Sequence, residues 1–403
     1  MLRLPTTGKQ ATIDWLQIGA VLRLMILGVL AIYSATLDNE TAVTLPWYRQ
    51  RFFMQIVWGL IGLGSATMLC LVDYHILARW SLVGYWATIL LLLAVLVPHI
   101  GATHGWGARR WIDLGPAQLQ PSEFAKVSFI FAMAHFLSRP PDELKQPAIF
   151  WKALGMIGLP FALILKEPDL GSALIFPAMG LLMLFAAGVP LRYLKRLVGG
   201  VGIVMALILV DILFAPPNWQ IKLEEYQRRR LLVYFGRDFA PRNAAPEEKA
   251  RLRKEQRDHS YNVEQALISV GSGGLFGRGW FQGKQAALGY LPKAVAHNDF
   301  IFSVIAEEKG FMGSVVVITL YSVVLFTGLR TASQARDRLG KLLAVGVVAM
   351  LFSHVFINIG MNIRIMPVTG VPLPLLSYGG SSVLCSLIAI GIMQNVHLHR
   401  RAY

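Results

Sequence analysis

ARWSLVGYWATILLLLAVLVP, residues 78–98, decides the fold class, because these 21 residues include only one charged side chain, Arg79. A helix needs about 20 apolar residues to cross the hydrocarbon core of a bilayer. Nine other blocks repeat this pattern, so we predict an all-α polytopic membrane protein with about ten transmembrane helices. The predicted spans are 17–36, 52–72, 78–98, 121–138, 147–165, 170–187, 194–214, 299–328, 340–361 and 377–397.

The composition of the 403 residues favours the same class. Hydrophobic residues make up 55% of the chain and charged residues 15%, whereas soluble domains hold about 25% charged residues. The mean hydropathy is +0.52, which disfavours a soluble globule and excludes a disordered or disulfide-rich chain. Cys70 and Cys385 both lie inside apolar blocks. We therefore expect two small buried hydrophobic side chains and no disulfide.

The distribution of Lys and Arg predicts the orientation of the helices. Basic residues beside spans tend to stay in the cytoplasm, and the alternate short loops hold 14 on one side and six on the other. We expect both termini in the cytoplasm and a large extracytoplasmic loop, 215–298, between helices seven and eight. Arg23 interrupts the first apolar block, so no cleaved signal is expected. Residues 1–403 are predicted to form a single integral membrane domain.

The loop 215–298 carries 14 basic and eight acidic residues, a net charge of +6. A positive surface outside the membrane suits an anionic headgroup or a pyrophosphate, but a solvated loop or a partner-docking surface explains it equally well. Nucleic acid is disfavoured because the charges lie on the translocated side. The run 237–260 has the Glu, Lys and Arg content of a solvated helix or of disorder. The stretch 271–279, GSGGLFGRG, misses the nucleotide-binding patterns, so we predict backbone turns near the membrane surface.

Charged residues also lie inside or beside the predicted spans. Glu123 and Lys126 follow Pro121 and share one helix face, where each would cost about 2.5–3.5 kcal/mol at a bilayer centre if it faced lipid. They are expected to face protein or water, either as a structural ion pair or as the wall of a substrate cavity. Asp169 follows Pro168 at a break between two spans. It could cap the next helix or face a polar site.

Asp299 lies where the basic loop enters the eighth predicted helix, beside His297. A carboxylate at the membrane boundary could act as a general base toward a sugar hydroxyl, since a free Asp has a pKa of about 3.9. It could instead be only a helix N-cap. The stretch 366–382, MPVTGVPLPLLSYGGSS, has three prolines and three glycines and cannot continue a helix. We predict an outer loop that can dip into the membrane where protein shelters it.

Four motifs in this order resemble the SEDS family (shape, elongation, division and sporulation proteins) of bacterial cell-wall polymerases, with RodA as the nearest branch. They are ARRW at 108–111 with QPSE at 120–123 and Lys126, EPDLG at 167–171, the stretch from GSGG at 271–274 to Glu308, and residues 367–382. The resemblance spans nearly all ten helices. It implies a GT-C-like, all-helical glycosyltransferase that uses lipid II at the outer face of the bacterial cytoplasmic (inner) membrane.

The resemblance implies roles for individual residues. Asp299 matches the essential aspartate of the family motif H-T-D-F, with His297 and Asn298 in the preceding places. The residues expected to bind substrate are Arg109, Trp111, Glu123, Lys126, Asp169, His297 and Ser377. The chain departs from the family at Lys293, where a Glu is usual, with two extra residues before Asn298. The run 237–260 is also longer than the family pattern.

The implied mechanism makes Asp299 the base that accepts the proton of the acceptor's C4 hydroxyl. Arg109, Lys126 and Arg228 are the candidate cations for the departing pyrophosphate. A divalent cation could assist, but no ligand set is legible, so no metal-binding residue is predicted.

The resemblance also implies partners. These are lipid II, the growing glycan strand, a class B penicillin-binding protein that supplies the transpeptidase, and other membrane proteins of the elongation complex. Two other functions remain open at this stage. Charges and broken helices inside a membrane also mark transporters and flippases of lipid-linked precursors. A non-catalytic scaffold for wall synthases is the third alternative.

Overall fold

A computed structural model describes residues 12–36, 46–98, 101–102, 109–113, 115, 118–214, 225–236, 239, 246–283, 285, 288–291 and 296–400. Within this part of the chain a helix covers each of the ten predicted spans, so the all-helical membrane fold is confirmed. Eight of these helices are long and apolar enough to cross a membrane. The other two, α5 (Ser81–Leu96) and α6 (Pro121–Leu137), are shorter. The exact number of spans therefore stays a prediction.

The eight long helices follow the predicted order, with most ends shifted by a few residues. They are α1 (Trp15–Thr36), α3 (Arg51–Cys70), α8 (Pro147–Lys166), α9 (Leu170–Ala187), α10 (Leu191–Phe214), α14 (Ile301–Gln334), α15 (Arg338–Asn362) and α16 (Gly380–His399). The short helices between them are η1 (Trp47–Arg49), α4 (Tyr74–Arg79) and α7 (Pro141–Leu144). The largest difference from prediction is in α14, which runs six residues past the predicted end and breaks at Gly310.

A small antiparallel sheet, which the sequence did not predict, lies between α5 and α6. Its order is β1 (Gly101–Ala102), β2 (Trp111–Asp113), β3 (Gln118–Leu119). Ile112 of β2 pairs with Gly101 on one side and with Leu119 on the other. Strands of two or three residues are too short to show the alternating pattern by which a strand is predicted.

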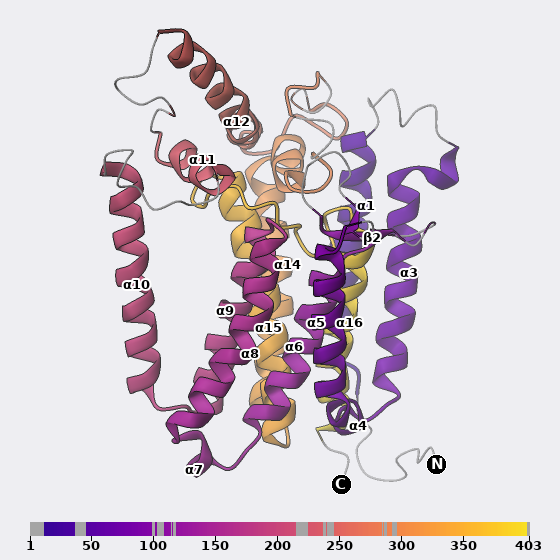
Figure 1. Cartoon of the computed structure of the whole chain (residues 1–403). Coiled ribbons are helices and arrows are strands. Elements are labelled where there is room, and N and C mark those ends of the chain that lie inside the picture. Colours follow the sequence, from indigo (N-terminus) through magenta and orange to yellow (C-terminus); the bar gives the residue numbers. More distant parts are fainter. Residues whose placement is uncertain are drawn as a thin grey trace.

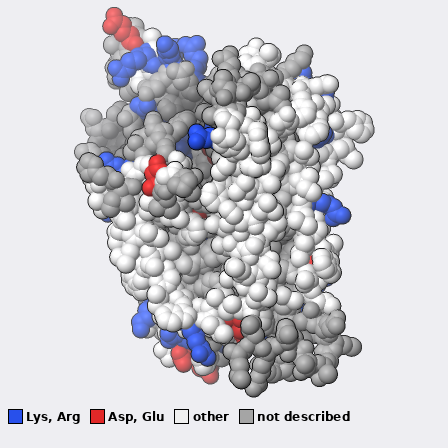
Figure 2. All heavy atoms as spheres, turned by 90° about the vertical axis from the view of Figure 1, so that its right-hand side faces the viewer, with Lys and Arg blue, Asp and Glu red and all other residues white. Residues whose placement is uncertain are grey.

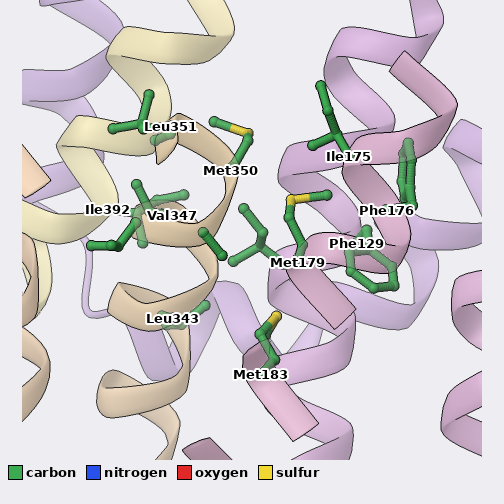
Figure 3. Close-up of a cluster of buried hydrophobic side chains, with 14 of the residues drawn as sticks. Phe129, Ile175, Phe176, Met179, Met183, Leu343, Val347, Met350, Leu351 and Ile392 are labelled. Carbon is green, nitrogen blue, oxygen red and sulfur yellow. The ribbon is translucent and has the colours of Figure 1, made fainter. Parts of the chain in front are cut away.

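The core lies where α6, α9, α15 and α16 pack together (Figure 3). Phe129 of α6 and Phe176 of α9 meet edge to face, with ring centroids 5.4 Å apart. Met179 of α9 and Val347 of α15 both belong to this buried cluster. Because lipid tails are as apolar as these side chains, close packing rather than the hydrophobic effect holds such helices together. This rigid centre supports the segments at the outer ends of the helices.

The region between α15 and α16 enters the bundle, as predicted. Val371, Leu373 and Leu376 are fully buried. A Cβ atom on Gly28 of α1 would lie 2.5 Å from the carbonyl oxygen of Leu375, so this segment packs directly on the helix backbone. Protein therefore shelters an irregular backbone inside the bundle, the condition under which such a backbone is tolerated at membrane depth.

The two ends of the molecule differ in what they carry (Figure 1). At one end the backbone N–H of Asp14, just before α1, donates to Gln394 of α16 at 3.2 Å, and the Asp14 carboxylate pairs with Arg330 of α14. At the other end lie α11 (Glu225–Tyr234) and α12 (Pro246–Ser272). The start of α1 and the end of α16 thus share one side, as the predicted topology requires.

The surface has the charge distribution of a membrane protein. In Figure 2 the Lys, Arg, Asp and Glu side chains gather mainly toward the two ends, and the middle is mostly uncharged. The helix α10 stands apart from the bundle in Figure 1, and its central residues are exposed, as suits a helix surrounded by lipid. Cys70 and Cys385 are both free. Of the two possibilities left open for the charged run, a solvated helix or disorder, the structure has a helix over 246–260, whereas 237–238 and 240–245 lie outside the described residues.

Candidate active site

A cavity of about 950 Å³ lies at the end of the bundle that carries α11 and α12. Its walls come from α3, β2, β3, α11, α12, the turn before α9, the segment before α14 and the segment that leads into α16. The acidic residues that line it are Asp169, Glu264 and Asp299. The arginines that line it are Arg51, Arg110, Arg229, Arg230 and Arg364. Since these cations outnumber the acids, the cavity suits an anionic group.

Asp299 lies on the cavity wall, two residues before α14 begins. Burial raises the pKa of its carboxyl from 3.8 to about 6, against the opposing effect of Arg230 and Arg110 and with a smaller contribution from Asp169. The carboxylate therefore predominates at neutral pH, and a general base is available. Phe300 is the N-cap residue of α14. The interpretation of Asp299 as a helix N-cap is therefore wrong.

Two asparagines of α15 hold the backbone of Asp299. The side-chain amides of Asn358 and Asn362 donate to the Asp299 carbonyl oxygen at 3.0 and 3.1 Å. Both asparagines are fully buried. Asn358 also donates to the carbonyl of Val371 at 2.7 Å, and Asn362 accepts from the hydroxyl of Ser303 at 2.6 Å. The position of Asp299 is thus fixed by α15 and by the first turn of α14.

His297 lines the cavity and contacts an arginine. Nη1 of Arg51 lies 3.3 Å from Nδ1 of His297. A guanidinium can only donate, so Nδ1 accepts this hydrogen bond and the proton of the neutral ring is on Nε2. Ser377, also predicted to bind substrate, is not among the described residues that line the cavity. Its hydroxyl donates to the carbonyl of Asn298, so it supports the segment next to Asp299.

Asp169 caps α9 and also lies on the cavity wall. Its carboxylate accepts from the N–H of Ser172 at 3.1 Å, which caps α9, and it also lines the cavity. The neighbouring Glu167 is buried, and this burial raises the pKa of its carboxyl to about 9, with Asp169 raising it further and Arg110 lowering it. Glu167 is thus a neutral acid at pH 7. Arg110 donates from Nε to the Glu167 carbonyl at 3.3 Å and is held beside this turn.

The ARRW motif contributes different residues from those expected. Trp111 lines the cavity, and its contact with substrate stays a prediction. Arg110 lines it too, whereas Arg109 is absent from its described lining. Arg228, another candidate cation, is also not among those lining residues, but Arg229 and Arg230 are.

Glu123 and Lys126 form a closed group inside the bundle. Lys126 Nζ lies 2.7 Å from Glu123 Oε1 and donates to Nε2 of His354 at 2.8 Å. The two side chains are 3% and 1% exposed, and neither belongs to the lining that the structure describes for the cavity. This geometry favours the structural ion pair over a cavity wall, and substrate contact by these residues stays a prediction.

Several residues that line the cavity were not predicted from the sequence. Arg51 begins α3 three residues after Tyr48, and Tyr378 follows Ser377. The one feature of the sequence that could have indicated Arg51 is its position as a cation in the first outer turn of an apolar span. Within the described residues no group of three or more His, Cys, Asp or Glu side chains is placed to hold a metal ion. The departure at Lys293 lies outside the described residues.

Comparison with known proteins decides the family. The model of the FtsW, RodA and SpoVE cell cycle proteins matches residues 14–402. The chain belongs to this family. The peptidoglycan glycosyltransferase MrdB of Escherichia coli K12 is 34% identical over 380 residues, covering 94% of this chain and 93% of MrdB. The resemblance predicted from the four motifs is therefore confirmed.

Solved structures of the FtsW, RodA and SpoVE family show the same fold. A chain of a peptidoglycan synthase complex that coordinates polymerization and crosslinking matches with a TM-score of 0.74 and 29% identity. It covers 97% of this chain and 99% of its own. The rod shape determining protein RodA of Thermus thermophilus matches with a TM-score of 0.64 and 28% identity, covering 97% of this chain and 98% of its own.

Proposed function

We propose that this chain is a peptidoglycan glycosyltransferase that extends glycan strands from lipid II. Family membership supports the reaction class, and its relative MrdB carries that activity in its name. The observation that carries the proposal is Asp299, a carboxylate with a pKa of about 6 on the wall of an arginine-lined cavity. Such a site pairs a base with cations, which is what transfer from a pyrophosphate requires.

In the proposed reaction Asp299 accepts the proton of the acceptor's C4 hydroxyl. The freed oxygen attacks the anomeric carbon of the donor strand and forms the glycosidic bond with inversion. The bond from that carbon to the pyrophosphate breaks, and its electron pair leaves with polyprenyl pyrophosphate. Arg51, Arg110 and Arg230 line the same cavity and stabilise the negative charge that grows on the leaving group. They take the role that the sequence assigned to Arg109, Lys126 and Arg228.

The proposal includes the setting of the enzyme. The whole chain acts as one membrane domain in the bacterial inner membrane, with both termini in the cytoplasm and 215–298 outside. The 14 to six distribution of basic residues supports this orientation. A class B penicillin-binding protein is the proposed partner, because a structural relative belongs to a complex for polymerization and crosslinking. The name of the RodA relative supports a role in cell elongation and shape.

The direct test is glycan synthesis by the purified chain. Wild-type protein in detergent is incubated with lipid II, alone and with its penicillin-binding partner, and the products are separated by length. The proposal predicts glycan strands. Movement of lipid II across vesicles without strand formation would support a flippase instead. Assembly of partners with neither activity would support a scaffold.

A further inference from the structure

The helix α14 is broken at Gly310, and a loop supplies hydrogen-bond partners for the backbone groups that the break leaves unpaired. In a regular helix the N–H groups of Phe311 and Met312 would donate to the carbonyls of Glu307 and Glu308. Here they donate instead to the carbonyls of Gly274 and Leu275, at 2.9 and 3.0 Å. We call residues 273–283 together with Gln285 the clasp. The two N–H groups freed by the break are therefore paired within the protein.

The clasp also supplies donors for the carbonyl groups on the N-terminal side of the break. The N–H groups of Arg278 and Gly279 donate to the carbonyls of Glu307 and Glu308, at 3.0 and 3.1 Å. Four backbone hydrogen bonds therefore replace two helical ones. This arrangement joins the clasp to the helix through its main chain.

Two glycines make this approach sterically feasible. Gly310 has φ of 66°, and a Cβ atom there would lie 2.3 Å from the nitrogen of Gly277. Gly277 has φ of 83°, and its Cβ atom would lie 2.1 Å from the carbonyl oxygen of Glu308. Both positions need a residue without a side chain, in a backbone conformation that glycine adopts at little cost. The glycine-rich stretch, which fits no nucleotide-binding pattern, is explained by this contact.

The carboxylate of Glu307 in α14 accepts hydrogen bonds from both α12 and the clasp. Its Oε2 accepts from the hydroxyl of Ser269 in α12 at 3.1 Å, and its Oε1 accepts from the N–H of Gln285 at 3.1 Å. Glu307 is 1% exposed. The next residue, Glu308, accepts from the hydroxyl of Ser34 in α1. The side chains at the break thus join three helices and the clasp.

The residues held in this way lead directly to Asp299. The break separates the short helical arm 301–309 from the rest of α14, and Asp299 lies two residues before the arm begins. The helix α12, which carries Ser269, also contributes Ser260 and Glu264 to the cavity wall. The spacing between the arm and this wall is set by the packing of Ala266 of α12 against Phe300 and Val304, and by the hydrogen bonds of Glu307 to Ser269 and Gln285. Nothing in the arm's own helical bonds fixes that spacing.

We propose that Glu307 is a positioning residue, which fastens α12 and the clasp to the arm and so aims Asp299 at the substrate. This inference rests on the proposed glycosyltransferase function. Glu307 is not among the described residues that line the cavity. Its effect passes through hydrogen bonds to Ser269 and Gln285, so shape and bonding matter and charge does not.

The test compares Glu307→Ala, Glu307→Gln and Ser269→Ala in the full-length protein with lipid II. A misplaced base lowers turnover more than binding, so Glu307→Ala is expected to lower kcat up to about 100-fold with little change in KM. Glu307→Gln is expected to restore kcat, because its carbonyl can accept from Gln285 and its amide can donate to the Ser269 hydroxyl. Ser269→Ala removes one of the two hydrogen bonds and should give an intermediate kcat.

A matched control is Ser322→Ala, which removes a hydroxyl on an exposed face that, among the described residues, donates to Ile318 of the same helix. It should leave kcat unchanged. Wild-type kcat in Glu307→Ala, or a loss in Glu307→Gln as large as that in Glu307→Ala, would overturn the proposal.

Hydrogen exchange of residues 301–309 gives a second measurement that needs no activity. The proposal predicts faster exchange in Glu307→Ala and wild-type exchange in Glu307→Gln and Ser322→Ala. Unchanged exchange in Glu307→Ala would overturn it even if the wild-type protein formed no glycan. Absence of glycan from the wild-type protein would itself refute the proposed function, so the two failures are distinguishable.

Discussion

Two buried charged groups in this protein have opposite surroundings. Lys126 lies within 2.8 Å of both Glu123 and His354, and its side chain is 1% exposed. Asp299 instead faces a cavity of about 950 Å³ that also contains five arginines. A charge inside a membrane protein must be stabilised by something. The first group is stabilised by its own members, whereas the second leaves room for an anionic substrate.

The largest effect on stability is expected from breaking the closed group. Lys126→Met leaves the buried Glu123 without its cation, which should lower the free energy of unfolding by about 3–5 kcal/mol. Thermal unfolding in detergent measures this loss. The double variant Glu123→Gln with Lys126→Met should regain part of it, because no unpaired charge remains.

Lys145→Met is the matched control for this prediction. Lys145 pairs with Asp142 at the same spacing of three residues and at 2.8 Å, but both side chains are exposed. Exposed pairs contribute little, so no measurable change in unfolding is expected. A Lys126→Met protein with wild-type stability and no activity would show that the closed group acts in catalysis, and the contrast between the two groups would fail.

A smaller effect is expected where α15 holds Asp299. Asn362→Ala removes the amide that donates to the Asp299 carbonyl. It also removes the oxygen that accepts a hydrogen bond from the Ser303 hydroxyl. Loss of such a buried partner costs about 1–3 kcal/mol, and kcat should fall because Asp299 is less well held. Unfolding and turnover of the same preparation are the measurements.

Ser353→Ala tests whether that loss is specific. Ser353 is buried in the same helix, but within the described part of the chain its hydroxyl donates to the carbonyl of Ala349, one turn earlier. Equal losses of turnover in Ser353→Ala and Asn362→Ala would contradict the assigned role of Asn362.

The smallest predicted effect is a shift in pH dependence. Burial raises the pKa of Asp299 to about 6, so its base form is lost as the pH falls through 6 and is present above it. Glycan synthesis should therefore rise with pH up to about 6 and level off above. Arg230 lowers this pKa, so Arg230→Ala should move the inflection to higher pH. The exposed Arg192 lies at the opposite end of the molecule, and Arg192→Ala should leave the inflection in place, whereas an equal shift in both variants would contradict the electrostatic explanation.

Much of the fold could be predicted because helix length and hydropathy are local properties of the chain. The ten apolar blocks gave ten helices, and Pro121 and Asp169 marked helix starts that the structure has. The break at Gly310 was missed, because its hydrogen bonds come from residues 274–279, about 30 positions earlier in the chain. Backbone hydrogen bonds between distant segments leave no pattern in the sequence except the glycines that permit them.

The site was predicted in part for the same reason. Asp299, Asp169, His297 and Trp111 do line the cavity. The choice between Arg109 and Arg110 was not predictable, since successive side chains of an extended segment point to opposite faces. Arg51 was missed because only the packed structure brings the start of α3 beside His297.

The most direct test of the central claim is glycan synthesis from lipid II by wild-type and Asp299→Asn proteins, with Asp142→Asn as an exposed control. A general base contributes about 10²–10⁴-fold to rate, so Asp299→Asn should lose at least about 100-fold in turnover while unfolding at the wild-type temperature. Asp142→Asn should remain fully active. Equal glycan synthesis by the Asp299→Asn and wild-type proteins would remove Asp299 from the reaction and contradict the account.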